Sequence, residues 1–326
     1  WQRRQVRAPC VAHRRPAPKA PRTPPSLSRC KRPPNAAATA VSSLPAWMIA
    51  TSLDNFYLSD EALQSSPTRR AGVDEETEFR LTVFGCELIQ EGTVLLKATQ
   101  AVACTGQVLL HRFYAKKSMT AFDMKRVAAT AVFLACKLEE NPRKLRDVIN
   151  VFHRMARRRE HKLIDHLEYF SKRYEDVRQD LIRTERHMLR EFGFCVHAEH
   201  PHKFVLNYLR MMEQPNELMQ CAWSLVNDSL RTSLCLRFTA DAVAVACIFL
   251  AARTLGVALP EEPPWYELFD VKLEDIEVMC ESILALYAML PPGGGCRAEY
   301  IAVGKFDETG TNAAAGAGSG AGAGAG

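Results

Sequence analysis

An internal repeat is the feature that most constrains how this chain of 326 residues folds. The ten residues from Val127 to Cys136 return 116 positions later as Val243 to Ala252, and five of the ten positions are identical. The same offset brings Phe122 onto Phe238. Both copies are apolar on all faces and rich in alanine, which is typical of a helix surrounded by other helices whose backbones approach closely. We therefore predict two helical bundles in tandem, each built around one copy.

The rest of the pattern is helical too. Apolar residues recur at three- and four-residue steps, for example in Leu81, Phe84 and Leu88, and no strand-like alternation appears. Helix breakers follow at Asn141-Pro142, at Gly193 and between Pro260 and Pro264. The sequence predicts an all-α fold with bundles over residues 79–197 and 198–290.

Charge divides the chain more sharply than its net charge of +5 suggests. Residues 1–53 hold ten Lys and Arg and no acid, and their Pro-, Arg- and Ala-rich composition predicts a disordered basic tail. An acidic lead follows over 54–78. The first bundle carries 22 basic and 14 acidic residues, a net +8, whereas the second carries 6 and 13, a net −7. Residues 291–326 predict a flexible, Gly- and Ala-rich tail. The two bundles therefore present unlike surfaces.

Several classes of protein are disfavoured. No apolar run approaches the ~20 residues that cross a bilayer, so we expect no contact with a membrane. The 11 cysteines form no CxxC pair and most lie in apolar helical patterns, which favours reduced thiols over a disulfide scaffold or a zinc ribbon. No nucleophile elbow, phosphate loop or HExxH motif occurs. We expect no catalytic residues, no metal and no cofactor.

Six stretches resemble the cyclin family, and within it the L-type cyclins most closely. In order along the chain they are FGCELIQEG (84–92), TGQVLLHRFY (105–114), RDVINVFH (146–153), FGFCVHAEHPHK (192–203), NDSLRT (227–232) and ACIFLAAR (246–253). The LEENPRKLRDVINVFH context is specific, whereas a lone alanine-rich helix is not. The resemblance implies two tandem cyclin boxes, each a bundle of five helices, in a protein that regulates a cyclin-dependent Ser/Thr kinase and is not itself an enzyme.

The resemblance also implies which residues contact the kinase. Lys137 matches the lysine that ends the third helix of the first box, and Glu185 matches the glutamate of the fifth. In cyclins this pair holds the backbone just before the kinase αC helix. Glu140, in the same KLEE run as Lys137, and Arg80, which aligns only with a one-residue gap, are further candidates. Without the resemblance, Lys137 would be interpreted as a cation that complements the helix dipole, and Glu185 as one of many surface acids.

Two other clusters suggest different chemistry. Cys195, His197, His200 and His202 lie within eight residues, but a structural zinc site usually draws ligands from two separated segments, so we do not expect a metal. Arg154, Arg157, Arg158, Arg159 and Lys162 form a basic run that we place after the fourth helix of the first box. Such a run is usually a solvated loop. We therefore do not expect direct nucleic-acid binding.

Three functions stay open at this point. An L-type cyclin implies a nuclear kinase complex in RNA polymerase II transcription and pre-mRNA splicing, with splicing or transcription factors as further partners. A two-box general transcription factor of the TFIIB type has the same architecture, but such factors usually have a zinc ribbon and bind DNA, which a bundle at −7 does not favour. The third is a scaffold with the cyclin fold and no active kinase.

Overall fold

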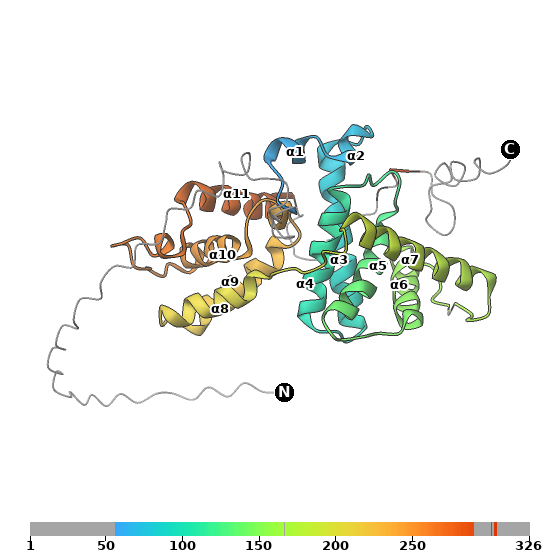
Figure 1. Cartoon of the computed structure of the whole chain (residues 1–326). Coiled ribbons are helices and arrows are strands. Elements are labelled where there is room, and N and C mark those ends of the chain that lie inside the picture. The colour runs from blue at the N-terminus through green and yellow to red at the C-terminus, as the bar shows by residue number, and fades with distance from the viewer. Residues whose placement is uncertain (1–55, 166, 290–300, 302, 305–326) are drawn as a thin grey trace, which may run out of the picture. The chain divides into compact units, whose positions relative to one another are not determined.

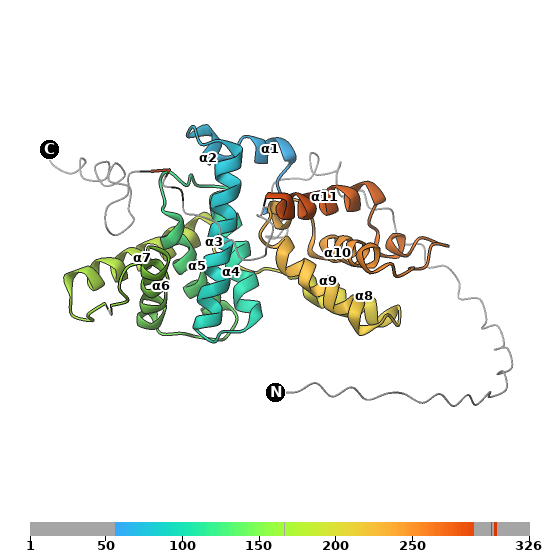
Figure 2. The same cartoon turned by 180° about the vertical axis from the view of Figure 1, so that it is seen from behind.

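The computed structural model describes residues 56–165, 167–289, 301 and 303–304, all within one compact unit, Ile49–Gly326. The predicted basic tail at 1–53 and most of the predicted tail at 291–326 lie outside these residues. The described part of the chain is helical and contains no strand, as predicted. Figures 1 and 2 show one group of helices from α3 to α7 and a second from α8 to α11.

The acidic lead and the first bundle contain seven helices. Two short ones, α1 (Asp60–Gln64) and α2 (Pro67–Arg70), precede the bundle. The five bundle helices are α3 (Glu75–Leu95), α4 (Gln100–Tyr114), α5 (Met124–Leu138), α6 (Leu145–Arg159) and α7 (Lys172–Glu191). The first bundle helix thus begins before position 79, because Asp74 caps it: its carboxylate accepts a hydrogen bond from the Thr77 backbone N–H.

The second bundle repeats this plan with one shortened element. It contains α8 (Pro201–Met211), α9 (Asn216–Ser229), the 3₁₀ turn η3 (Ser233–Leu236), α10 (Ala240–Leu255), the 3₁₀ turn η4 (Trp265–Phe269) and α11 (Leu273–Met289). The fourth of its five bundle elements is η4, one turn instead of a full helix. Pro260, Pro263 and Pro264 lie just before it, and proline cannot donate the hydrogen bonds that would extend a helix through them.

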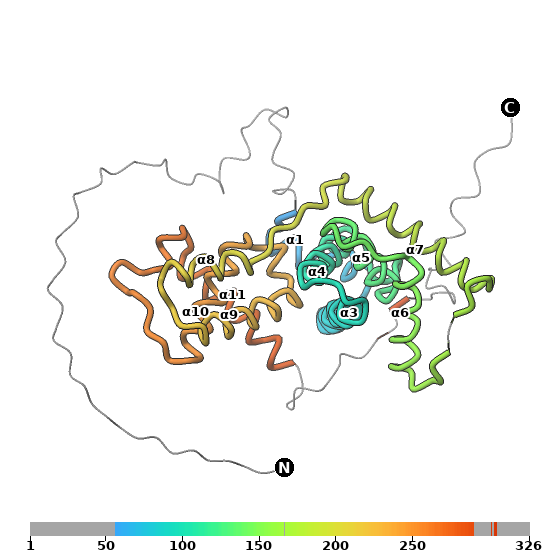
Figure 3. Tube along the Cα trace, turned by 90° about the horizontal axis from the view of Figure 1, so that it is seen from below, coloured from blue at the N-terminus to red at the C-terminus, as the bar shows by residue number. Residues whose placement is uncertain are grey.

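The repeated segments are the central helices, as predicted. Helix α5 packs against α3, α4, α6 and α7, and α10 packs against α8, α9 and α11. In Figure 3, α3 and α4 are seen nearly end-on beside α5. Fully buried alanines occur on both central helices, including Ala131 and Ala246. Small side chains let the surrounding backbones come close, which explains why both copies are rich in alanine.

Gly106 is one position where close helix packing leaves little room for a side chain. It lies on α4 against α3 and α5, and a Cβ there would be 3.0 Å from Ile89 Cγ2 and 3.8 Å from the Ala135 Cβ. Glycine is therefore required by the approach of three helices and not by its backbone conformation.

Two local predictions need correction. Apart from Lys162, the basic run does not follow the fourth helix of the first box but forms its last turns, because α6 continues to Arg159. Within the predicted C-terminal tail, Ile301 and Val303 are half-buried and pack against the core of the first bundle.

Candidate functional site

The predicted pair of residues comes together on the surface of the first bundle. Lys137 lies in the last turn of α5, and its Nζ donates a hydrogen bond of 2.6 Å to Glu185 Oε1 on α7. The ammonium also lies 4.1 Å from the centre of the Phe133 ring, one turn earlier on α5. The Lys137 side chain is 46% exposed and that of Glu185 is 12% exposed. The ammonium therefore lies at the surface, whereas the carboxylate is mostly covered.

A buried ion pair holds the same two helices together below the surface. Arg126 Nη1 on α5 lies 3.6 Å from Asp180 Oδ2 on α7, and these side chains are only 8% and 7% exposed. Asp180 also pairs with Arg183, one turn further along α7, at 3.3 Å. Removing one partner of a buried pair is strongly destabilising, so this contact helps to fix the register of α7 against α5. In this register Glu185 lies beside Lys137.

An exposed ion pair alone contributes little to folding, typically less than about 1 kcal/mol. The Lys137–Glu185 pair does offer binding groups. An ammonium has three donors, and a carboxylate accepts hydrogen bonds at both oxygens. Together they can satisfy the N–H and C=O groups of an extended backbone, and such charge-assisted hydrogen bonds are stronger than neutral ones.

The two other predicted residues occupy different positions. Glu140 follows Glu139, the C-cap residue of α5, with a φ of 51°, and it is exposed close in sequence to Lys137. Arg80 lies on α3, is exposed and pairs with Glu76 on the same helix at 2.6 Å. Among the described residues, no contact joins Arg80 to the Lys137–Glu185 pair. The structure therefore brings together Lys137 and Glu185 but does not bring Arg80 to them.

Most residues of the basic run form ion pairs with acids of the first bundle. Arg159 and Arg158 pair with Glu91 of α3 at 3.0 and 3.2 Å, and Arg157 pairs with Asp165 at 3.1 Å. These three guanidiniums therefore neutralise acids of the same chain, instead of forming an open cationic surface.

The cysteine and histidine cluster serves the joint between the two bundles. His200 Nε2 lies 2.8 Å from Thr105 Oγ1, which also donates to Glu139 Oε1 at 2.6 Å. His202 Nε2 lies 2.9 Å from Asn227 Oδ1. Burial lowers the pKa of His200 to about 4 and lowers that of His202, so both imidazoles are neutral near pH 7. Among the described residues no group of His, Cys, Asp or Glu has the arrangement of a metal site.

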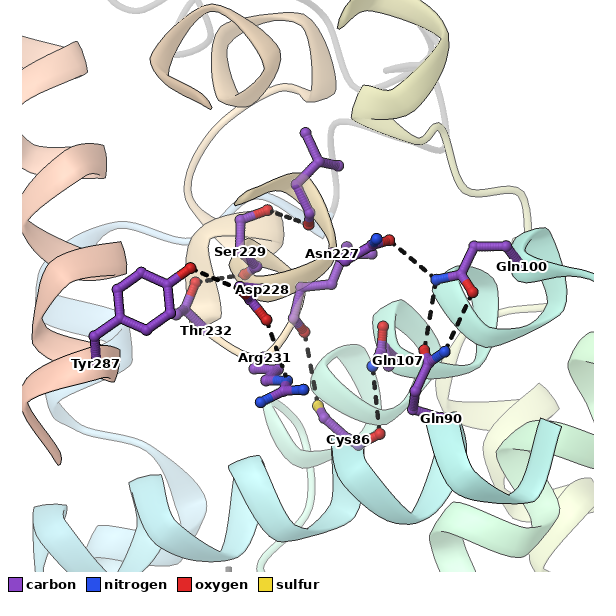
Figure 4. Close-up of polar contacts among 12 residues, drawn as sticks. Cys86, Gln90, Gln100, Gln107, Asn227, Asp228, Ser229, Arg231, Thr232 and Tyr287 are labelled. Atoms are coloured by element: carbon purple, nitrogen blue, oxygen red, sulfur yellow. Dashed lines mark hydrogen bonds and ion pairs between the residues drawn. The ribbon is translucent and has the colours of Figure 1, made fainter. Parts of the chain in front are cut away.

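Polar contacts in the same joint were not predicted at all. Figure 4 shows Asn227 of α9 pointing toward Gln100 of α4, and Gln100 Nε2 donates to Asn227 Oδ1 at 3.0 Å. Nearby, His111 Nε2 of α4 lies 2.9 Å from the Leu230 carbonyl oxygen, which also accepts a bond of 3.6 Å from the Cys86 thiol. No sequence signal marks these contacts, since the partners lie 127 and 119 residues apart and are not related by the repeat.

The deeply buried thiols are not reactive groups. All eight described cysteines are free, and burial raises the pKa of Cys104 and of Cys235 to about 12 each. A thiol with such a pKa is protonated near pH 7 and is a poor nucleophile.

None of the described helices is both long enough and apolar enough to span a membrane.

Comparison with known proteins gives consistent matches. Residues 55–197 match the family "Cyclin, N-terminal domain", and residues 200–285 match "Cyclin-T2-like, C-terminal domain". Cyclin-L1-1 of Arabidopsis thaliana is 54% identical over 79% of this chain and 61% of its own length. Human Cyclin-L2 is 43% identical over 74% of this chain and 46% of its own length. The chain thus spans about half to three-fifths of the length of these relatives.

Solved structures share the fold at low identity. A chain in the crystal structure of the yeast RNA Pol II CTD kinase CTDK-1 complex matches with a TM-score of 0.61 at 17% identity, over 76% of this chain and 79% of that chain. A chain of the CAK complex from Chaetomium thermophilum matches with a TM-score of 0.55 at 15% identity, over 72% and 78%. Together, the repeated helical bundles, both family matches and the L-type relatives show that the chain belongs to the cyclin family.

Proposed function

We propose that this chain is the regulatory subunit of a cyclin-dependent Ser/Thr kinase, which it binds and activates through its first bundle. The observation that carries the proposal is the Lys137–Glu185 pair, which joins the exposed ammonium at the end of the central helix to α7, beside the buried Arg126–Asp180 pair between the same helices. Glu140 would extend the same contact, and Arg80 would contribute only at its edge.

The Lys137–Glu185 pair would support activation of the kinase without taking part in the phosphoryl transfer. Its donors and acceptors would hold the backbone that precedes the kinase αC helix. A held αC helix places its glutamate against the lysine that positions ATP, and that ion pair is required for phosphoryl transfer. On this proposal the cyclin supplies positioning and the kinase supplies every catalytic group.

The biological setting is also part of the proposal. The relatives are L-type cyclins, and the solved complex with the same fold is a kinase of the RNA polymerase II C-terminal domain. We infer that the chain acts in the nucleus, in RNA polymerase II transcription and pre-mRNA splicing, with splicing or transcription factors as additional partners.

The test is recovery of a kinase by the tagged full chain from nuclear extract, followed by phosphorylation of a peptide with the RNA polymerase II C-terminal repeat. We expect a cyclin-dependent kinase in the eluate and phosphate incorporation that depends on the cyclin. Recovery of no kinase would contradict the proposal. Recovery of a kinase without activity would favour the scaffold alternative.

The TFIIB-like alternative makes a different prediction. A gel shift on duplex DNA would show binding that weakens steeply as salt increases, because phosphate contacts release counterions. We expect no such shift from this chain, since the second bundle has a net charge of −7 and the arginines of α6 pair with acids of the first.

A further inference from the structure

The second bundle has a groove at the end of its central helix, at the place where the first bundle has the Lys137–Glu185 pair. The groove has a volume of about 610 Å³. The last turns of α10, the connection 257–264, η4 and the start of α11 line it. All four segments belong to the second bundle, so the groove is separate from the proposed kinase contact.

The repeat relates this groove directly to the first bundle. The offset of 116 places Arg253 on Lys137 and Phe249 on Phe133. The Arg253 guanidinium lies 5.1 Å from the centre of the Phe249 ring, which matches the stacking of the Lys137 ammonium on its own phenylalanine. Both members of this second stacked pair line the groove.

An acid completes the comparison. Glu277 lies on α11, the last helix of the second bundle, just as Glu185 lies on α7, the last helix of the first. Arg253 and Glu277, both described, form no ion pair with each other, although both line the groove. The second bundle therefore has the same kinds of group as the first, but they border an open groove instead of closing on each other.

The lining can hold apolar side chains. Trp265 is only 4% exposed, Val257, Leu259 and Tyr266 are half-buried, and Leu273 is exposed. A volume of about 610 Å³ lies within the range of roughly 300–1,000 Å³ of clefts that bind small ligands or anchor side chains. Leu259 and Leu273 thus leave apolar atoms accessible at the groove, where an apolar side chain can contact them.

The charge around the groove defines the partner. Glu261 and Glu277 line it, Glu262 and Glu274 are exposed nearby in sequence, and Arg253 is the one cation among the lining residues in the described part of the chain. The whole bundle has a net charge of −7. Such a field attracts cationic partners and repels nucleic acid and acidic peptides.

We propose that this groove binds a linear segment of a partner protein in which one or two apolar anchor residues are flanked by Lys or Arg. The apolar anchor would lie against Trp265 and Leu259, and the flanking cations would pair with Glu261 and Glu277. This binding site is additional to the kinase contact and does not depend on it.

The test begins with a selection. Random 12-residue peptides displayed on phage are panned against the full chain, and a synthetic peptide with the selected consensus is then titrated by fluorescence polarisation. We expect a consensus with Lys or Arg around a Leu or an aromatic residue. No enrichment, or a consensus without cations, would overturn the proposal.

Variants then locate the binding site. Glu261→Lys with Glu277→Lys should weaken the peptide by about 10-fold or more, since two attractive charges become repulsive. Ala258→Trp, an exposed lining position, should weaken it similarly by filling the groove without removing a packing contact. The matched control, Glu213→Lys with Glu217→Lys, changes two exposed acids of the same bundle outside the lining and should change affinity less than about 3-fold.

Circular dichroism melts of the three variants establish that each is folded. Equal binding of the peptide to the chain and to both groove variants would overturn the proposal. So would an equally large effect of the control. Neither result depends on whether the chain binds a kinase, so a failure here and a failure of the proposed function are distinguishable.

Discussion

Each bundle is built around its own copy of the same central helix, but the groups at the end of that helix are arranged differently in the two bundles. In the first, Lys137 is stacked on Phe133 and joined to Glu185 at 2.6 Å, which makes a small charged contact point on a bundle of net +8. In the second, Arg253 is stacked on Phe249, but the neighbouring acid stays apart across an apolar groove on a bundle of net −7.

The connection after the central helix explains this difference. In the first bundle the full helix α6 follows α5, whereas in the second the Pro-rich connection and the single turn η4 follow α10. A shorter element covers less of the central helix and leaves room for a groove. A duplicated core can therefore support two unlike binding surfaces, one charged and one apolar.

The largest expected effect concerns the buried pair that the first bundle has and the second lacks. Asp180→Ala should lower the free energy of unfolding by about 3–5 kcal/mol, because the buried Arg126 guanidinium loses its carboxylate. The repeat relates Arg126 to Ala242 of the second bundle, which has no charge at this core position. Urea denaturation followed by circular dichroism measures the change.

Two variants control this prediction. Asp176→Ala, an exposed acid on the same helix, should cost less than about 0.5 kcal/mol. Arg126→Met with Asp180→Leu, which removes both charges, should cost much less than the single change. If Asp180→Ala unfolds at the same urea concentration as the unaltered chain, the buried pair does not set the register of α7.

The next effect compares the second helix of each bundle. Gly106 on α4 corresponds to Ala222 on α9, so the second bundle accepts a Cβ where the first does not. Gly106→Val should destabilise the chain by about 2 kcal/mol, because the new atoms press on Ile89 and Ala135. Ala101→Val on the same helix is the control, with an expected cost of less than about 1 kcal/mol. Equal costs for both would mean that α4 does not pack as closely as described.

The joint between the bundles gives a smaller effect. Asn227→Leu removes the acceptor that serves Gln100 and His202, and should cost about 1–2 kcal/mol, because two partly buried groups lose this hydrogen bond. Asn207→Leu, an exposed position on α8, should be nearly neutral. A joint held only by apolar packing would instead tolerate both changes equally in a thermal melt.

The smallest effect depends on pH. Burial lowers the pKa of His200 from 6.5 to about 4, so between these values the unfolded state binds a proton that the folded state does not. Stability should therefore fall as pH decreases below 6.5, by roughly 1 kcal/mol at pH 5.5. His200→Gln should flatten the unfolding free energy over this range. An unchanged slope in the variant would show that other groups are responsible.

The sequence predicted what depends on local pattern. Alanine-rich copies 116 residues apart predicted both central helices, and the resemblance to cyclins predicted that Lys137 and Glu185 belong together. It did not predict that His111 contacts the Leu230 carbonyl, because partners 119 residues apart leave no periodic signal. Nor did it predict that Arg158 and Arg159 pair with Glu91, since a run of like charges does not show which acid faces it.

The groove of the second bundle could not be predicted from the sequence either. Its lining comes from four segments, and only the fold brings Leu259 and Glu277 to the same place. The prolines at 260–264 indicated a break in the helix but not what the break exposes. Features that arise from how a connection lies over a core need the structure.

The measurement that tests the central claim most directly compares the two helix ends in one kinase recovery experiment. Lys137→Ala with Glu185→Ala removes the pair of the first bundle, and Arg253→Ala with Glu277→Ala removes two charged groups that line the groove of the second. We predict that the first double variant loses at least about 90% of the recovered kinase, since each charged hydrogen bond contributes about 1.5–3 kcal/mol, while the second recovers as much as the unaltered chain. Equal recovery by both variants, or a loss confined to the second, would contradict the account.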